Sequence, residues 1–255
     1  MSNITTLFIG KSHLHLPLVK STNLYAQELI SKSKPIEGTA ISAAHQTQGR
    51  GQIGSKWVSE PDKNLIVSVI LYPKFLLPTQ QFKLSQAVSL AVFHTVAQYI
   101  DPAIISIKWP NDIYVRHKKI AGILIQNAVS RKNIQSSIIG LGLNVNQSAF
   151  PNDLANPTSL TLETGESFPI KRICSIFFQY LEQFYLKLKN QNWNTLEVQY
   201  LKNLYRFGTE SQFIINSDSP RIVRGKIMGV SPLGQLRVSI NDQEQLFNVK
   251  EISFV

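Results

Sequence analysis

Hydrophobic side chains follow two different patterns in the first two thirds of the chain. The run from Leu65 to Tyr72 is apolar almost throughout, which is typical of a strand buried on both faces. In the stretch from about Gln80 to Ile100, apolar residues would cover most sides of a helix, which predicts a helix packed against a sheet. Ser21 is predicted as the N-cap of a shorter helix that ends near Ser33. Further strands are predicted at 39–44, 104–108, 113–116, 119–126 and 136–143.

Beyond residue 160 the pattern changes to helices and then to short strands. Apolar residues from Ile173 to Leu188 recur three and four positions apart, and a second stripe follows from Trp193 to Leu204, so two packed helices are predicted. After Gly208, short apolar runs separated by turn residues predict a small barrel at 213–215, 222–228, 235–240 and 245–249. We therefore predict an α+β chain, with a mixed β-sheet packed with helices in residues 1–206 and a small β-barrel domain in residues 207–255.

Composition and charge narrow the class of protein. With 255 residues and 43% hydrophobic side chains, the chain can bury a sizeable core. The net charge of +10 favours an acidic partner or a phosphorylated substrate, but the cations lie in short clusters that are more typical of solvated faces than of a nucleic-acid footprint. The one cysteine, Cys174, excludes an intramolecular disulfide framework, and the sequence contains no export or membrane segment. We therefore expect a cytoplasmic protein.

The stretch from Gln46 to Trp57, QTQGRGQIGSKW, has the composition of a ligand-binding loop. Gly49, Gly51 and Gly54 allow backbone amides to approach a ligand closely. Arg50 offers a planar fork of donors to a carboxylate or phosphate, whereas the glutamine amides suit a neutral amide or urea. The loop therefore predicts a site for an anion joined to a polar ring. A mobile hairpin tip with a solvated arginine is the simpler alternative.

A second motif, TrpProAsnAsp at 109–112, forms a rigid turn that carries an amide and a carboxylate. Lys119 opens the strand that follows it, where its ammonium can point into a site, and Gly122 interrupts that strand, which often marks close approach by a ligand. An ordinary hairpin lysine and a plain helix cap at 21–23 are the simpler alternatives. The sequence GLGLNVN at 140–146 places glycines and an amide at another strand end, so we expect three loops to converge on one face.

In their order and spacing these motifs resemble the biotin protein ligase family, also called biotin–[acetyl-CoA-carboxylase] ligase. The matching stretches are STN at 21–23, GRGQIGSKW at 49–57, KWPNDIYVRHKKIAGILIQ at 108–126, GLGLNVN at 140–146 and NPTSL at 156–160. The resemblance is strong from Ser21 to Leu160. In the rest of the chain, the resemblance lies in the order of the predicted elements. It implies a class II synthetase-like catalytic domain of the biotin–lipoate ligase type, followed by an SH3-like domain.

The resemblance also implies a two-step reaction. The carboxylate of biotin attacks the α-phosphate of ATP, and a lysine of a biotin carboxyl carrier protein or domain then attacks the biotinyl-adenylate. Arg50 and Lys119 are implied as catalytic cations, because two anions must be brought together. Mg²⁺ is implied as well, with Asp112 as a candidate ligand. The residues implied to bind biotin are Ser21, Thr22, Asn23, Gln46, Gly49, Arg50, Gly51, Gln52, Lys119 and Gly122. Those implied to bind ATP and the adenylate are Arg50, Trp57, Lys108, Asn111, Lys119 and Asn144.

The chain departs from the family pattern at two places. Where the family loop often reads GRGRRGR, this chain has Gln52, Ile53 and Ser55, so we expect it to retain the adenylate less tightly. Gln126 stands where relatives commonly carry an acid. Only 20 residues precede Ser21, too few for the winged-helix domain of relatives that repress transcription, so a ligase without a DNA-binding module is expected. The pattern leaves a homodimer open, and a lipoate ligase or a non-enzymatic nucleic-acid binder are the competing interpretations.

Overall fold

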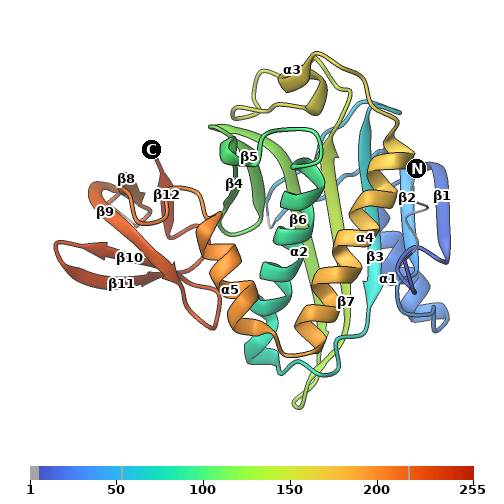
Figure 1. Ribbon diagram of the computed structural model, residues 1–255, viewed down its shortest axis with the longest axis horizontal. Coiled ribbons are helices and arrows are strands. Elements are labelled where there is room, and N and C mark those ends of the chain that lie inside the picture. Colours follow the sequence, from blue (N-terminus) through green and yellow to red (C-terminus); the bar gives the residue numbers. More distant parts are fainter. Residues whose placement is uncertain (1–5, 53, 218) are drawn as a thin grey trace.

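The computed structural model describes residues 6–52, 54–217 and 219–255, and a seven-stranded mixed sheet forms its centre (Figure 1). The strands lie in the order β1-β2-β3-β7-β6-β5-β4, with β1 and β2 parallel and the other neighbours antiparallel. Their bounds are β1 His13–Val19, β2 Ala40–Gln46, β3 Asn64–Leu71, β4 Ile105–Lys108, β5 Asp112–Val115, β6 Lys118–Val129 and β7 Ile134–Asn144. The α-helices are α1 Thr22–Lys32, α2 Gln81–Val96, α3 Leu160–Thr164, α4 Ile170–Lys189 and α5 Trp193–Lys202.

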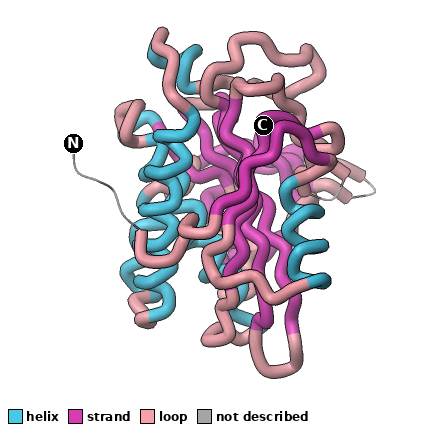
Figure 2. The backbone as a smooth tube through the Cα atoms, turned by 90° about the vertical axis from the view of Figure 1, so that its right-hand side faces the viewer, coloured by secondary structure: helices cyan, strands magenta, loops and turns pink. Residues whose placement is uncertain are grey.

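Helices cover both faces of this sheet, so strand β3 is buried along its whole length. Val67 and Val69 point into the large core that α2 and α4 share with the sheet. Ile70, one position along, packs on the opposite face with Ala26 of α1 and Ile138 of β7. Figure 1 shows α2 and α4 side by side in front of the sheet, and Figure 2 shows helices on either side of the strands.

The C-terminal residues form a second, antiparallel sheet in the order β11-β10-β9-β8-β12, on the left of Figure 1. Its strands are β8 Glu210–Ile215, β9 Arg221–Val230, β10 Leu236–Ile240, β11 Gln243–Phe247 and β12 Ile252–Phe254. The connection between α5 and β8 contacts both sheets, because Leu204 pairs with Ile107 of β4 and Phe207 pairs with Ile227 of β9. In addition, Trp109 Nε1 donates a 2.9 Å hydrogen bond to the carbonyl of Gly234, in the turn between β9 and β10. The second sheet therefore packs close to the TrpProAsnAsp turn.

The predicted α+β class is confirmed, and the second sheet is consistent with the expected SH3-like domain; the boundary at 206/207 stays a prediction. The helix predicted at 80–100 is shorter: Pro78–Gln80 form a 3-10 turn and α2 ends at Val96. The amides of Gln98 and Tyr99 bond three residues back, which tightens the chain ahead of Pro102. Strands β1 and β12 and helix α3 were not predicted. Within the described residues, no helix combines the length and apolar character needed to cross a membrane.

Candidate active site

The three sequence motifs converge on one cavity of about 170 Å³. It opens on the α1 face of the sheet, because Ile66 and Gly140 have the same strand parity as Ile70 and Ile138, which pack against α1. The residues that line it are Ser21, Thr22, Asn23, Gln46, Arg50, Gly51, Gln52, Ser55, Lys56, Trp57, Ile66, Asn111, Asp112, Lys119, Gly122, Ile123, Leu124, Gly140, Leu141 and Gly142. Most of the residues implied by the resemblance therefore share one site.

One wall of the cavity is a buried network of neutral polar side chains. Gln46 Oε1 accepts hydrogen bonds from the Thr22 amide at 2.7 Å and from the Thr22 hydroxyl at 3.2 Å. Ser68 Oγ lies 2.7 Å from Thr22 Oγ1 and 2.6 Å from Asn23 Oδ1, and Asn23 Nδ2 donates to Gln126 Oε1 at 2.9 Å. Gln46 thus satisfies the first amide of α1. The wall offers hydroxyls and amides to an uncharged polar ligand.

The predicted capping by Ser21 is corrected by this arrangement. Ser21 occupies the N-cap position with extended backbone, but its side chain makes no capping hydrogen bond. The side chain of Gln46, from the end of β2, supplies the acceptor for the Thr22 amide instead. A residue 24 positions away therefore ties the helix terminus to the glycine-rich loop that follows β2.

The loop is anchored to the sheet by the indole of Trp57, which lies against two glycines. Gly122 of β6 and Gly142 of β7 are register partners, and a Cβ on either would meet the Trp57 ring. The Trp57 amide also donates to the Gly49 carbonyl at 3.1 Å, which closes the base of the loop. Only glycine leaves room for the ring here, so the glycines noticed in the two strand motifs form a platform for the loop.

Within the loop, a short hairpin presents Arg50 to the cavity. Arg50 pairs with Lys56 in an antiparallel bridge, and the Gly51 amide donates to the Ser55 carbonyl at 3.0 Å. The Arg50 side chain is exposed at the cavity mouth. Ile53, one of the departures from the family pattern, lies outside the described residues. The loop therefore carries a solvated cation on a support that is fixed mainly at its base.

Lys119 is a further cation that lines the cavity, and more contacts hold it in place than hold Arg50. Its ammonium lies 2.7 Å from Asp112 Oδ1 and 5.9 Å from the centre of the Trp57 ring. Its amide donates to the Asn156 carbonyl at 2.8 Å, and its carbonyl accepts from the Thr158 amide at 2.9 Å. Burial raises the pKa of the Asp112 carboxyl, and the Lys119 ammonium opposes that rise. The pair is the charged centre of the site.

Three predicted residues lie outside the lining of this cavity. Gly49 is buried at the base of the loop, where its carbonyl accepts from the Trp57 amide. Lys108 donates to the Tyr114 hydroxyl at 3.0 Å and lies over the ring of Phe254, and burial lowers the pKa of its ammonium. Asn144 is buried at the end of β7, where its Nδ2 donates to the Thr158 carbonyl at 2.9 Å. Asn144 therefore acts on the chain segment that supports Lys119, and the nucleotide-binding roles expected of Lys108 and Asn144 stay predictions.

Sequence patterns did not identify Ser68, Ile66 or Leu124 as parts of the site, whereas Gly140 belongs to the GLGLNVN motif that was expected there. A signal existed for Ser68, because it is the one polar residue inside the apolar run of β3 and has no exposed surface. A polar group buried that deeply needs hydrogen-bond partners, which here are Thr22 and Asn23. Ile66 and Leu124 are ordinary strand residues by sequence, and only the fold brings them to the cavity.

Comparison with known proteins agrees with this geometry. Residues 15–144 match the model of the biotin/lipoate A/B protein ligase family. The bifunctional ligase/repressor BirA of Bacillus subtilis is 36% identical over 170 residues, which cover 64% of this chain and 50% of BirA. The biotin–[acetyl-CoA-carboxylase] ligase of Mycobacterium tuberculosis is 32% identical over 72% of this chain and 68% of its own length. The chain spans about half the length of the bifunctional relatives that it matches.

Among solved structures, the biotin protein ligase of Aquifex aeolicus in complex with biotin and ATP superposes with a TM-score of 0.76. It is 26% identical, and the match covers 96% of this chain and 99% of that protein. The similarity therefore includes the second sheet as well as the seven-stranded sheet. The family match extends across the loop, the TrpProAsnAsp turn and the end of β7. The chain belongs to the biotin/lipoate A/B protein ligase family.

Proposed function

We propose that this protein is a biotin protein ligase, which activates biotin with ATP and transfers it to a lysine of a carrier protein. The observation that carries the proposal is the division of the cavity into two chemical halves. Thr22, Asn23 and Gln46 form a neutral polar wall, and Lys119 lies with Arg50 where charge is needed. Biotin has the matching division, with a neutral ureido ring at one end and a carboxylate at the other. The complex of the Aquifex aeolicus relative with biotin and ATP supports this proposal.

In the first step, a carboxylate oxygen of biotin forms a bond to the α-phosphorus of ATP, and the bond to the bridging oxygen of pyrophosphate breaks. Both reactants are anions, so cations must lower their repulsion and hold them in line. We assign Lys119 to the reacting carboxylate and α-phosphate, because it is fixed on β6. We assign Arg50 to the phosphate from the loop, whose end is free to close over the nucleotide.

In the second step, the ε-amine of the acceptor lysine attacks the carbonyl carbon of biotinyl-5'-AMP, an amide forms, and AMP leaves. The attacking amine must be neutral and loses a proton as the amide forms. Lys119 and Arg50 then serve to stabilise the negative charge of departing AMP. The net charge of +10 favours an acidic face on the biotin carboxyl carrier protein or domain.

Mg²⁺ would bind at this site only together with the phosphates of the nucleotide. Asp112 is the one carboxylate among the lining residues, and its Oδ1 is paired with Lys119. Within the described residues, no group of three or more histidine, cysteine, aspartate or glutamate side chains could hold a metal ion. Mg²⁺ characteristically binds through substrate phosphates, waters and one or two carboxylates, and Asp112 Oδ2 would supply that carboxylate. The metal would neutralise the charge of the pyrophosphate.

We place the reaction in a reducing compartment such as the cytoplasm, where a lone thiol stays reduced. Cys174 is buried in α4, and burial raises the pKa of its thiol to about 12, so it is an inert core residue. We also propose that residues 207–255 form a separate domain that contributes to binding ATP or the carrier. Its proximity to the TrpProAsnAsp turn, through the bond between Trp109 and Gly234, supports that role.

The test is biotin-dependent exchange of pyrophosphate into ATP, measured beside lipoate and octanoate as alternative acids. We expect exchange with biotin only, and its loss in Lys119→Ala. Lys118→Ala is the matched control, because Lys118 is the exposed neighbour of Lys119 on β6 and does not line the cavity. Exchange with lipoate in place of biotin would assign the protein to the lipoate branch of the family. Exchange with none of the three acids would refute the proposed activity.

A further inference from the structure

The position of Lys119 depends on a chain segment that lies far from it in sequence. Pro157 and Lys119 form an isolated parallel bridge, with hydrogen bonds from the Lys119 amide to Asn156 and from the Thr158 amide to Lys119. The register of β5 and β6 shifts beside this point, so that Ile120 is an extra residue on β6. Such a bulge re-aims a neighbouring side chain. The segment at 156–158 therefore supports Lys119 next to this bulge, in addition to the pairing of Lys119 with Tyr114 of β5.

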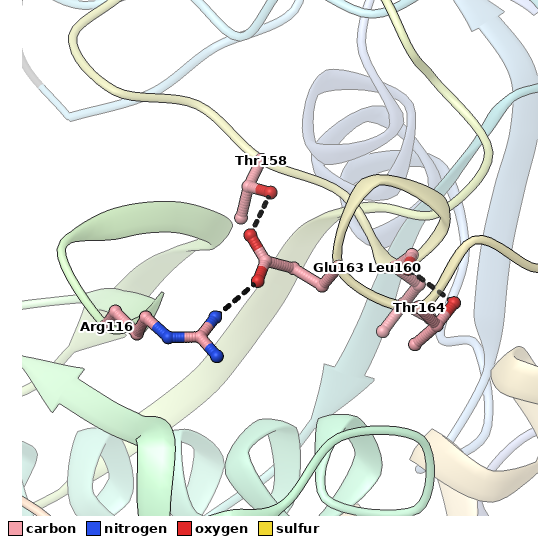
Figure 3. A network of polar contacts seen from close by, with 5 residues as sticks. All are labelled: Arg116, Thr158, Leu160, Glu163 and Thr164. Carbon is pink, nitrogen blue, oxygen red and sulfur yellow. Dashed lines mark hydrogen bonds and ion pairs between the residues drawn. The ribbon is translucent and has the colours of Figure 1, made fainter.

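Glu163 in turn fixes this segment to the hairpin that carries Lys119 (Figure 3). The Thr158 hydroxyl donates to Glu163 Oε1 at 2.6 Å, and Arg116 Nη1 pairs with Glu163 Oε2 at 2.9 Å. Arg116 lies in the turn between β5 and β6, three residues before Lys119. The Glu163 side chain is 8% exposed and Thr158 is fully buried, so water competes little for the bond between them. The Arg116 side chain is 62% exposed, so solvent weakens its ion pair with Glu163, and the bond from Thr158 is the better protected of the two.

The start of helix α3 sets the direction of the Glu163 side chain. Ser159 is the N-cap of this helix, and its hydroxyl oxygen accepts from the Leu162 amide at 3.2 Å. Glu163 itself bonds through its amide to the Ser159 carbonyl at 3.1 Å. Its two carboxylate oxygens accept hydrogen bonds from two separate segments of the chain. A carboxylate suits this arrangement because it has acceptors only. A glutamine could accept from Thr158 but would turn its amide hydrogens toward Arg116.

We propose that Glu163 is a positioning residue for Lys119, acting through Thr158 on one side and Arg116 on the other. The proposal rests on the proposed function, because it assigns Glu163 to the adenylation step in which Lys119 takes part. Glu163 does not line the cavity and touches no reacting group. Its role is to keep the segment at 156–158 and the β5–β6 turn at a fixed separation, so that the Lys119 ammonium stays in the cavity.

The kinetic test compares biotin-dependent pyrophosphate exchange in Glu163→Ala, Glu163→Gln and the control Glu166→Gln. A displacement of about 1 Å in a catalytic group costs on the order of 100-fold in rate, so we expect that loss of kcat in Glu163→Ala. The KM for biotin should change by less than about threefold, because the Thr22 and Gln46 wall belongs to other elements. Glu163→Gln should recover part of the rate by keeping the bond from Thr158. Glu166 is exposed and should be silent.

Hydrogen exchange of the backbone amides gives a second, activity-independent measurement. The Lys119 and Thr158 amides should exchange at least tenfold faster in Glu163→Ala than in the wild type or in Glu166→Gln, because the segment that pairs with Lys119 is released. Unchanged hydrogen exchange of these two amides in Glu163→Ala, or an unchanged kcat per folded molecule, would overturn the positioning role. If the wild type shows no biotin-dependent pyrophosphate exchange, the proposed function fails. The hydrogen exchange of the Lys119 and Thr158 amides still decides whether Glu163 holds Lys119.

Discussion

Substitution by alanine should have different effects at two glycines on the same face of β7. Gly140 and Gly142 both line the cavity, and an alanine at either position would place a methyl group against a neighbouring side chain. At Gly140 the neighbour is the carboxamide of Asn23, and at Gly142 it is the indole of Trp57. The difference lies in what holds each neighbour. Gly140→Ala should therefore reduce stability, whereas Gly142→Ala should reduce activity.

Asn23 cannot move away without leaving buried polar groups unpaired. Its side chain is bonded to Gln126 Oε1 at 2.9 Å and lies 2.6 Å from Ser68 Oγ, and the residue is 4% exposed. Leaving a buried polar group unsatisfied costs about 1–3 kcal/mol, and forcing a methyl group into a packed site costs a similar amount. We expect Gly140→Ala to lower the free energy of unfolding by about 3 kcal/mol, which corresponds to a fall of roughly 6–12 °C in Tm for a chain of this size.

Trp57 can move away at a lower energetic cost, because it is half-buried and lies in the connection between β2 and β3, outside any helix or strand. Gly142→Ala should cost less than about 1 kcal/mol of stability, since surface segments absorb such changes. Displacing the indole frees the base of the loop and moves Arg50, so pyrophosphate exchange should fall at least about tenfold. Urea unfolding followed by circular dichroism measures the first quantity, and the exchange assay measures the second. Equal loss of stability in both variants, with normal activity in Gly142→Ala, would refute this account of the glycine platform.

Three further predictions concern the charge of the loop, the buried acid and the contact between the sheets. Gln52→Arg should restore a cation to the loop and slow the release of radiolabelled biotinyl-AMP, and unchanged or faster release would contradict the retention hypothesis. Burial raises the pKa of Asp112, so the folded state gains stability as the pH falls through that pKa, and the gain is complete below the ordinary carboxyl pKa. Lys119→Met removes the opposing ammonium, so the free energy of unfolding in urea should depend more steeply on pH in this variant. Adding Asp112→Asn to Lys119→Met should abolish this pH dependence. Trp109→Phe removes the bond to Gly234 and should lower the free energy of unfolding by about 1–2 kcal/mol, so an unchanged urea midpoint would argue against a stabilising contact.

The long periodic elements could be predicted from sequence because their burial matches their pattern. Strand β3 has every residue buried, and α4 carries a regular apolar stripe. Strand β1 escaped because it lies at the edge of the sheet, where Leu14 and Leu18 are exposed and Pro17 weakens the strand signal. Helix α3 has five residues, too few for a period to be visible.

The site was predictable as a set of motifs but not as a set of supports. Glycines and cations at strand ends indicated which segments would converge, and Lys119 with its neighbours does lie in one cavity. The bond from Gln46 to Thr22 and the pairing of Lys119 with 156–158 join residues 24 and more than 35 positions apart. No local pattern specifies such pairings, because the same side chains could be satisfied by water or by nearer partners. The fold alone decides among those partners.

Two of the cations that line the cavity, Arg50 and Lys119, are supported differently, and this difference separates two requirements of the proposed reaction. Lys119 belongs to a central strand and is fixed through the Thr158 segment, as a group that orients reacting atoms must be. Arg50 belongs to a loop that contacts the sheet through Trp57 and through the bond from the Thr47 amide to the Val19 carbonyl, so we expect its tip to admit the nucleotide and then close over it. Changes in the support of Lys119 should therefore alter the rate of adenylation, whereas changes in the charge of the loop should alter how long the adenylate stays bound. A protein that activates its substrate and then waits for a carrier needs the two quantities to be adjustable independently, and placing the cations on separate supports achieves this.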